Sequence, residues 1–155
     1  MIKRASCEDI SALENLLGQV LYVHHLARPD LFKPEGSKFS RQELEELLED
    51  DQKPVFVFVD EENRVLGHLF TIIQEHGGLA KESVKTLFID DLCVDETARG
   101  QKIGEKLYQY ALAYAREIGC YNVTLDVWNA NQGALRFYER LGLIPQMTVM
   151  EQILD

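Results

Sequence analysis

The chain has 155 residues, 46% hydrophobic and 27% charged, which predicts one globular domain over residues 1–155; no apolar run reaches the ~20 residues of a membrane span. The formal net charge of −10 argues against a nucleic-acid partner, because nucleic-acid binding depends on clustered lysine and arginine. Cys7, Cys93 and Cys120 lack metal-type spacing and the first residues lack a signal-peptide core, so we expect no disulfide framework, no metal site and a cytoplasmic location.

The chain begins with a predicted short strand over Ile2–Ala5, followed by Ser6 as the N-cap of a helix that runs to about Val23. His24 and His25 lie at the end of this helix. They could line a substrate pocket, but a helix C-terminus also favours histidine electrostatically, and we favour that simpler interpretation.

Residues 28–38 contain two prolines and a glycine, which predicts a loop. Ser40 and Glu43 then form an S-x-x-E capping box that opens a second, acidic helix. We interpret its acidic residues as a solvated face, and the preceding loop as a candidate lid over a substrate.

Two apolar runs, Val55–Val59 and Val65–Gln74, flank the turn sequence DEEN and predict an antiparallel hairpin. His68 lies in the second of these strands, where we expect a structural role. Residues 75–85 predict a flexible connection to the next strand.

The strand predicted for Thr86–Val94 is apolar except for Asp90 and Asp91. A turn containing Arg99 and Gly100 joins it to a helix predicted from about Lys102 to Ile118. The first N–H groups of a helix have no intrahelical partners, and the helix dipole adds partial positive charge there. With Arg99 and Lys102 beside it, this turn predicts an anion site suited to phosphate.

Asn122–Trp128 predicts a further strand, Asn131 the cap of a helix that ends at Arg140, and Met147–Leu154 a final strand. The order of elements is therefore β-α-α-β-β-β-α-β-α-β, with a parallel crossover at its centre. We expect an α/β (α+β) fold in which a central mixed sheet of six or seven strands is flanked by about four helices.

Two motifs stand on these elements. Residues 99–104 read RGQKIG after a strand and before a helix, and residues 131–138 read NQGALRFY before a glycine-containing turn. In this order, the motifs resemble those of the Gcn5-related N-acetyltransferases, which carry R-x-x-G-x-G and N-x-x-A-x-x-(F/Y)-Y, and the resemblance covers essentially the whole chain. Lys102 departs from the pattern, because it occupies the first glycine position of the first motif. It could add a phosphate contact or weaken cofactor binding.

The resemblance implies a fold in which two strands splay apart around acetyl-CoA, whose acetyl group is moved to an amine. The acceptor would be a small amine or a peptide N-terminus, and the acidic charge would suit it, although acidity alone also keeps a protein soluble. A homodimer is a possible assembly. The residues implied in cofactor binding are the strand residues Leu92, Cys93 and Val94, the turn residues Arg99, Gly100, Gln101, Lys102, Ile103 and Gly104, and Asn131 and Tyr138.

For the chemistry, the resemblance implies Tyr138 as the acid that protonates the leaving thiolate, with a core tyrosine as the alternative. A backbone N–H near Val94 could bind the developing oxyanion. Asp90 and Asp91 are the candidate bases, or else a structural pair. Because neighbouring strand residues point to opposite faces, Asp90 would share the face of Leu92 and Val94, unless a bulge intervenes.

Three alternatives stay open at this point. Cys93 could form an acyl-enzyme, although a buried small apolar residue is the simpler interpretation. The same fold could hold an acyl-CoA as a sensor without turnover. A different α/β phosphate-binding domain is disfavoured, because the sequence has neither a G-x-G-x-x-G fingerprint nor a Walker pattern.

Overall fold

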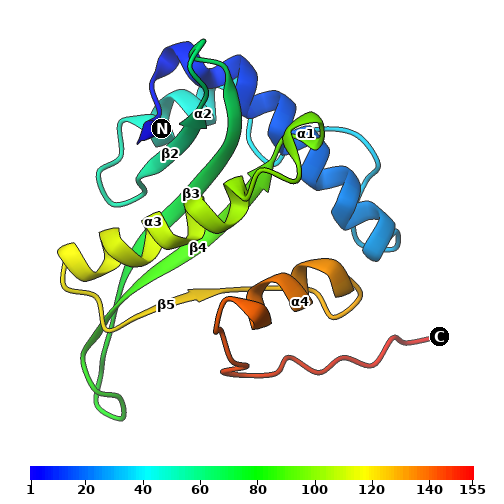
Figure 1. The fold of residues 1–155 in the computed structure, drawn as a ribbon. Coiled ribbons are helices and arrows are strands. Elements are labelled where there is room, and N and C mark those ends of the chain that lie inside the picture. Colours follow the sequence, from blue (N-terminus) through cyan, green and yellow to red (C-terminus); the bar gives the residue numbers. More distant parts are fainter.

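The computed structural model describes all 155 residues, which form one mixed five-stranded sheet with helices on both faces (Figure 1). The strands follow one another in sequence order across the sheet, β1-β2-β3-β4-β5. The pairs β1–β2, β2–β3 and β3–β4 are antiparallel, and β5 is parallel to β4. The strands are β1 (Ile2–Arg4), β2 (Val55–Val59), β3 (Val65–His76), β4 (Val84–Val94) and β5 (Asn122–Leu125).

Four α-helices and two 3-10 turns connect these strands: η1 (Cys7–Asp9), α1 (Ile10–Ala27), α2 (Arg41–Leu48), η2 (Glu96–Ala98), α3 (Ile103–Glu117) and α4 (Gln132–Arg140). The capping box predicted for the second helix is present: the Glu43 N–H donates to the Ser40 hydroxyl, and the Ser40 N–H donates to the Glu43 carboxylate. None of the helices combines the length and apolar character that a membrane crossing requires.

The sheet separates two hydrophobic clusters. On one face, Leu87 and Ile89 of β4 and Leu69 of β3 pack with Ile103 and Leu107 of α3. On the other face, residues of β2 and Phe70 of β3 pack with α1 and α2. In Figure 1, α3 lies across the sheet while α1 runs along its opposite side. The central strands β3 and β4 are therefore covered on both faces.

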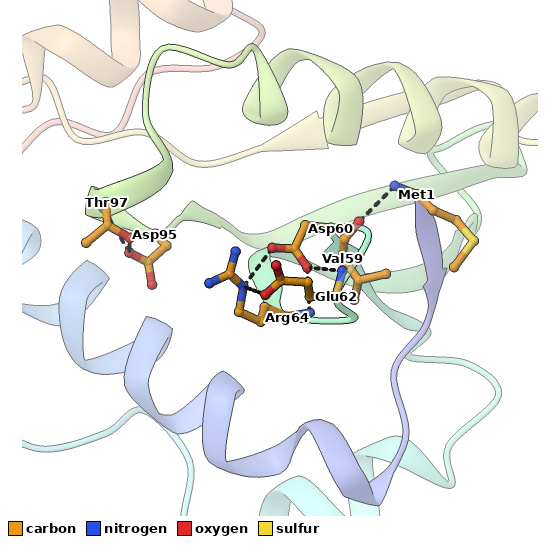
Figure 2. Close-up of polar contacts among 7 residues, drawn as sticks. All are labelled: Met1, Val59, Asp60, Glu62, Arg64, Asp95 and Thr97. Atoms are coloured by element: carbon orange, nitrogen blue, oxygen red, sulfur yellow. Dashed lines mark hydrogen bonds and ion pairs between the residues drawn. The ribbon is translucent and has the colours of Figure 1, made fainter.

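Backbone and side-chain contacts hold the N-terminal edge of the sheet (Figure 2). The Met1 ammonium group donates to the Val59 carbonyl at 2.9 Å, and the Val59 N–H donates back to Met1 at 2.8 Å. In the β2–β3 turn, the Asp60 carboxylate accepts from the backbone N–H of Arg64 and from its guanidinium, both at 2.8 Å. This clasp closes the hairpin predicted from the sequence.

The α/β class and the order of the first nine elements are as predicted, but the number of strands is not. Met147–Leu154 forms no strand, and the strand predicted for Asn122–Trp128 ends at Leu125. Both segments have strand-like composition, but a strand exists only where its backbone finds a pairing partner. Residues beyond Leu125 lie past the last residue of β5 that pairs with β4.

Strand β4 contains a bulge at Asp90. Phe70 pairs with Asp91 and Thr71 pairs with Ile89, so Asp90 has no partner on β3. An extra residue of this kind exchanges the two faces of the strand from that point onward. Leu87 and Ile89 face α3 before the bulge, whereas Leu92 and Val94 face α3 after it. The bulge is the condition under which the strand alternation no longer predicts the faces of Asp90 and Asp91, and with it Asp91 does not share the face of Ile89.

Candidate functional site

A groove of about 680 Å³ lies between β4, the start of α3, and α4. Eight predicted site residues line it: Leu92, Val94, Arg99, Gly100, Lys102, Ile103, Gly104 and Tyr138. The far wall comes from Ala134, Phe137, Arg140 and Leu141 of α4 and the residue that follows it. The structure thus brings the two sequence motifs, which are about 30 residues apart, to opposite sides of one groove.

The turn at the floor of this groove contains two residues with left-handed backbone. Gly100 has φ of 88°, which a glycine adopts without steric cost, and Lys102 has φ of 60°. Lys102 is the N-cap of α3, and its side chain makes no capping hydrogen bond. The helix N-terminus therefore presents backbone N–H groups and a partial positive charge toward the groove.

The charges around the groove favour an anion. Arg99, Lys102 and Arg140 line it, against the single carboxylate of Glu105. Asp95 stabilises the backbone segment just before Arg99. Its carboxylate accepts from the backbone N–H of Thr97 at 2.8 Å and from the Thr97 hydroxyl at 2.7 Å (Figure 2). This is an N-cap on η2, and it holds the short segment that leads from β4 into the turn.

Gly104 permits a close approach of α3 to α4. A Cβ at this position would lie 3.2 Å from the Phe137 ring and 3.5 Å from the Val94 side chain. The glycine leaves the space that these two side chains need, so any larger residue would push α4 away or fill the groove. Its place in the predicted motif is thereby explained by packing.

Strand β4 pairs with β5 only over Thr86–Ile89. From Asp91 to Val94 its partner is β3 alone, so the edge of β4 toward the groove is not occupied by another strand. Backbone N–H and C=O groups on such an edge are ready-made partners for an extended ligand. This opening is the splaying of two strands that the resemblance implies.

Tyr138 projects from α4 into the groove, between the rings of Phe137 and Tyr108. Burial raises the pKa of its phenol, and the nearby charge of Asp91 raises it further. The phenol therefore stays protonated at neutral pH. The charge of Asp91 thus acts on Tyr138, although the two side chains have different neighbours.

Asp91 is buried and forms a hydrogen-bonded pair with the buried His68 of β3, whose Nε2 contacts its carboxylate. The bulge at Asp90 makes this pair possible, because it directs Asp91 to the face of the sheet on which His68 lies. The Nδ1 atom of His68 is buried without a hydrogen-bond partner. His68 was expected to be structural, and its contact with Asp91 could not be read from its position in the sequence.

Asp90 has different surroundings. Its carboxylate accepts from Lys38 Nζ at 2.8 Å, and the Lys38 side chain is half exposed. Lys38 lies in the loop between α1 and α2, the segment interpreted as a candidate lid. The two adjacent acids thus have different partners. Asp91 pairs with a buried residue of the sheet, and Asp90 pairs with a half-exposed lysine from a surface loop.

The C-terminal half of α1 completes this second face. His24 packs its ring 5.0 Å from Phe32, and its Nδ1 has no hydrogen-bond partner. Burial lowers the pKa of His24; the charge of Asp91 opposes this effect and that of Lys38 adds to it. Because His24 is held neutral, it does not compete with a cationic ligand for the charge of Asp91.

Cys93 does not line the groove. Its thiol points toward α1 and donates to the Leu16 carbonyl at 3.5 Å. Burial, with a smaller effect of the Asp91 charge, raises its pKa to about 12. A thiol of this kind is a poor nucleophile, which supports the simpler interpretation of a buried apolar residue.

Two further predicted cofactor residues, Gln101 and Asn131, also lie outside the groove lining. The Asn131 side chain accepts from the Ala134 N–H at 3.1 Å and so caps α4, as expected. A cofactor contact for either residue stays a prediction.

Comparison with known proteins decides the family. Residues 20–143 match the model of the acetyltransferase (GNAT) family. The chain belongs to this family. The predicted enzyme class, an acetyl-CoA-dependent N-acetyltransferase, is confirmed by this assignment.

Individual relatives agree with this GNAT assignment. A crystal structure of a mutant of the BH1408 protein from Bacillus halodurans has a TM-score of 0.95, with 29% identity over 100% of this chain and 99% of that chain. The aminoglycoside N-acetyltransferase AAC(6')-Iy in complex with CoA shares the fold, with a TM-score of 0.74 and 14% identity over 100% and 99% of the two chains. A curated glucosamine 6-phosphate N-acetyltransferase from Arabidopsis thaliana is 31% identical over 67 residues, which span 43% of this chain and 43% of that protein.

The groove of this GNAT chain has features that suit two parts of a CoA ester. Its apolar wall, with Leu92, Val94 and Phe137, suits a pantetheine arm, and its cationic turn suits a diphosphate. Phe137 of α4 and Leu141, which follows this helix, were not predicted as part of the site. The amphipathic pattern of α4 was the available signal, but a pattern does not tell which neighbour a helix will face.

Proposed function

We propose that this chain transfers the acetyl group of acetyl-CoA to a primary amine by direct transfer in a ternary complex. The observation that carries this proposal is the position of Tyr138: it lines the groove, and its phenol responds to the charge of Asp91 on the neighbouring face of β4. A proton donor, Tyr138, therefore lines the groove, and a candidate proton acceptor, Asp91, is near enough for its charge to act on that phenol.

In this proposal the cationic turn holds the phosphates of the CoA ester, through Arg99, Lys102 and the first N–H groups of α3. The open edge of β4 from Leu92 to Val94 pairs with the pantetheine amides, and its N–H groups supply a donor for the developing oxyanion. Bound acetyl-CoA supplies an activated acyl carbon. In this proposal Lys102 is a phosphate ligand, the first of the two roles that its departure from the motif allows; its position in the groove lining supports this role.

An alkylammonium group has a pKa near 10.4 and must lose a proton before its nitrogen attacks. We assign Asp91 as the acceptor of this proton at its carboxylate, while the Nε2–H of His68 holds that carboxylate in place. The nitrogen then bonds to the acyl carbon as the carbon–sulfur bond breaks, and the second proton that the nitrogen loses in becoming an amide replaces the one that Tyr138 gives to the sulfur. The Tyr138 hydroxyl gives its proton to the departing sulfur, a role supported by the raised pKa that keeps this phenol protonated.

The acceptor amine would reach Asp91 from the side of α1 and the loop between α1 and α2. His24 and the Lys38–Asp90 ion pair lie at this approach. Because His24 is neutral, it does not repel an ammonium group that approaches Asp91. If the exposed ion pair between Lys38 and Asp90 opens, Asp90 becomes a second anionic contact for that group.

Calorimetric titration with acetyl-CoA and CoA, followed by thiol release with a panel of small amines and N-terminal peptides, tests the proposal. We expect binding, release with one class of acceptor, and intersecting initial-velocity patterns that require both substrates together. Binding without release from any acceptor would favour an acyl-CoA sensor. Parallel velocity patterns would indicate a covalent acyl-enzyme and would contradict direct transfer.

A further inference from the structure

Asp90 lies where the sheet opens, and its carboxylate holds one of the chain's own primary amines. The pairing of β4 with β5 ends at Ile89, and the pairing with β3 resumes at Asp91, so Asp90 has no register partner on either side. Its carboxylate accepts from Lys38 Nζ at 2.8 Å. An alkylammonium group of the protein therefore lies beside the first residue of the open part of β4, next to the edge proposed to hold the pantetheine arm.

The residue that follows Lys38 fixes where this amine is presented. Phe39 stacks on Phe70 of β3, with ring centroids 5.8 Å apart and the rings 13° from parallel. Phe70 is the residue that pairs with Asp91 across the two strands. Lys38 Nζ also lies 5.5 Å from the centre of the Phe39 ring. These aromatic contacts hold the end of the loop against the face of the sheet that carries Asp91.

His24 links the same amine to the proposed base. Burial has the largest effect on the pKa of His24 and lowers it, and the charges of Asp91 and Lys38 then act on it in opposite directions. Lys38 and Asp91 are the two charges to which this imidazole responds. The amine of Lys38 therefore belongs to the electrostatic environment of the approach proposed for the acceptor.

The other lysines have different surroundings. Lys85 donates to the carbonyl of Ile118 at 2.8 Å, and Lys106 lies over the ring of Phe58. Lys38 is the only lysine whose Nζ contacts either acid of the β4 bulge. Its side chain is nevertheless half exposed, so the stem is free to change its rotamer and move the amine along the edge.

We propose that Lys38 is a self-acetylation site, at which Nζ accepts the acetyl group of acetyl-CoA bound to the same chain. This inference rests on the proposed function, because it uses the same donor, groove and proton donor. An amine that is tethered at the site needs no encounter step, so the reaction is favoured even without an added acceptor.

The step balances with the groups already described. The Lys38 ammonium gives one proton to the Asp90 carboxylate to which it is hydrogen-bonded, and Nζ then bonds to the acyl carbon as the carbon–sulfur bond breaks. The Tyr138 hydroxyl gives its proton to the sulfur, and the second proton lost by Nζ replaces it. The proton on Asp90 passes to water. The products are an amide at Lys38, the free CoA thiol and one proton. Because acetylation removes the lysine charge, Asp90 is left without its ion-pair partner.

Incubation of the full chain with isotopically labelled acetyl-CoA, without any acceptor, tests this inference by peptide mapping in a mass spectrometer. We expect Lys38 to be acetylated faster than Lys33 by about 10-fold or more, because only Lys38 is held at the site. Lys33 is an exposed lysine of the same loop and reports uncatalysed acetylation by the thioester. The rate constant at Lys38 should not depend on protein concentration. Tyr138→Phe should slow the labelling of Lys38 by about 100-fold and leave that of Lys33 unchanged.

Two matched variants complete the test. Lys38→Arg keeps a cation for Asp90 but has no amine to acylate, so the intact chain should lose its rapid label, whereas Lys33→Arg should retain it. Circular dichroism should show an unchanged fold in both. Equal labelling of the two lysines, a rate constant that rises with protein concentration, or rapid label in Lys38→Arg would each overturn the inference. Acetylation of added amines with Lys38 unmodified would overturn this inference alone. Absence of transfer to every amine, Lys38 included, would overturn the proposed function as well.

Discussion

The two faces of β4 beyond its bulge are assembled in different ways. On the α3 face, Leu92 and Val94 meet a turn that begins only a few residues later, at Arg99. On the α1 face, Asp91 pairs with His68, 23 positions away, and Cys93 contacts Leu16, 77 positions away. The first face is local in sequence and cationic. The second is made of distant contacts and contains the acids. A sequence motif thus predicts a local arrangement well when its residues are neighbours along the chain, and it does not predict contacts between distant segments.

The largest expected effect separates the two acids. Asp91→Asn should lower kcat by about 100-fold or more, because it removes the proposed base and general acid–base catalysis is worth about 10²–10⁴. Asp90→Asn, which removes an exposed ion pair with Lys38, should change kcat by no more than several-fold. The KM for acetyl-CoA should stay the same in both. Steady-state kinetics measures this; a larger loss in Asp90→Asn would reverse the assignment.

Tyr138→Phe tests the α3 face. We expect kcat to fall by about 100-fold with unchanged CoA affinity, because only the proposed acid is lost. Since burial raises the pKa of this phenol, its proton is retained well above neutral pH, and the wild-type rate should show no alkaline loss between pH 7 and 9 from this group. Tyr108→Phe, whose ring lies 6.4 Å from that of Tyr138, is the control and should keep most activity. Equal losses in both variants would indicate a packing effect.

Lys102→Ala should raise the Kd for CoA by about 3- to 10-fold, as expected for one charge-assisted phosphate contact near solvent. The affinity of the Lys102→Ala variant for CoA should also depend less on salt concentration than that of the wild type. Lys102→Gly removes the same charge but relieves the left-handed strain, so it isolates the effect of the charge from that of the backbone. Lys106→Ala, which lies over Phe58 instead, is the matched control. Tighter binding by the glycine variant would mean that the lysine obstructs the site.

The α1 face should protect its thiol. With a pKa of about 12, Cys93 exists as thiolate at pH 8 at a level on the order of 10⁻⁴, and it is buried as well. Iodoacetamide should therefore label the exposed Cys7 quickly and leave Cys93 unmodified in the native protein. Mass spectrometry after proteolysis gives both extents. Rapid labelling of Cys93, reduced by acetyl-CoA, would revive the acyl-enzyme alternative.

The smallest expected effect concerns His24. Burial lowers its pKa in the folded chain, so at a pH below 6.5 the unfolded chain binds more protons, and stability should fall as pH decreases through this range. His24→Gln should lose this part of the pH dependence. Urea unfolding at pH 7.5 and 5.5 compares the two proteins. An identical decrease in both would place the dependence on other groups.

Much of the fold follows from local features of the sequence. Ser40 and Glu43 cap α2, Gly100 and Arg99 mark the turn before α3, and Asn131 caps α4, each through contacts within a few residues. Such features depend on backbone geometry and short-range hydrogen bonds, which can be predicted from the residue types at neighbouring positions. The apolar period of each helix and strand is likewise local. These patterns predicted nine of the ten elements in order and the turn of the groove.

Tertiary structure decided what depends on pairing and register. With the bulge at Asp90, Asp91 lies beside His68 and Asp90 lies beside Lys38. The alternation of residues in an apolar strand does not predict where such a bulge occurs. Met147–Leu154 has the composition of a strand but lacks a partner, because backbone pairing is a property of two segments, not of one. The sequence by itself determined the family, the groove turn and the candidate residues. Only the folded chain decided which acid pairs with His68 and which with Lys38, and which predicted strand is left without a partner.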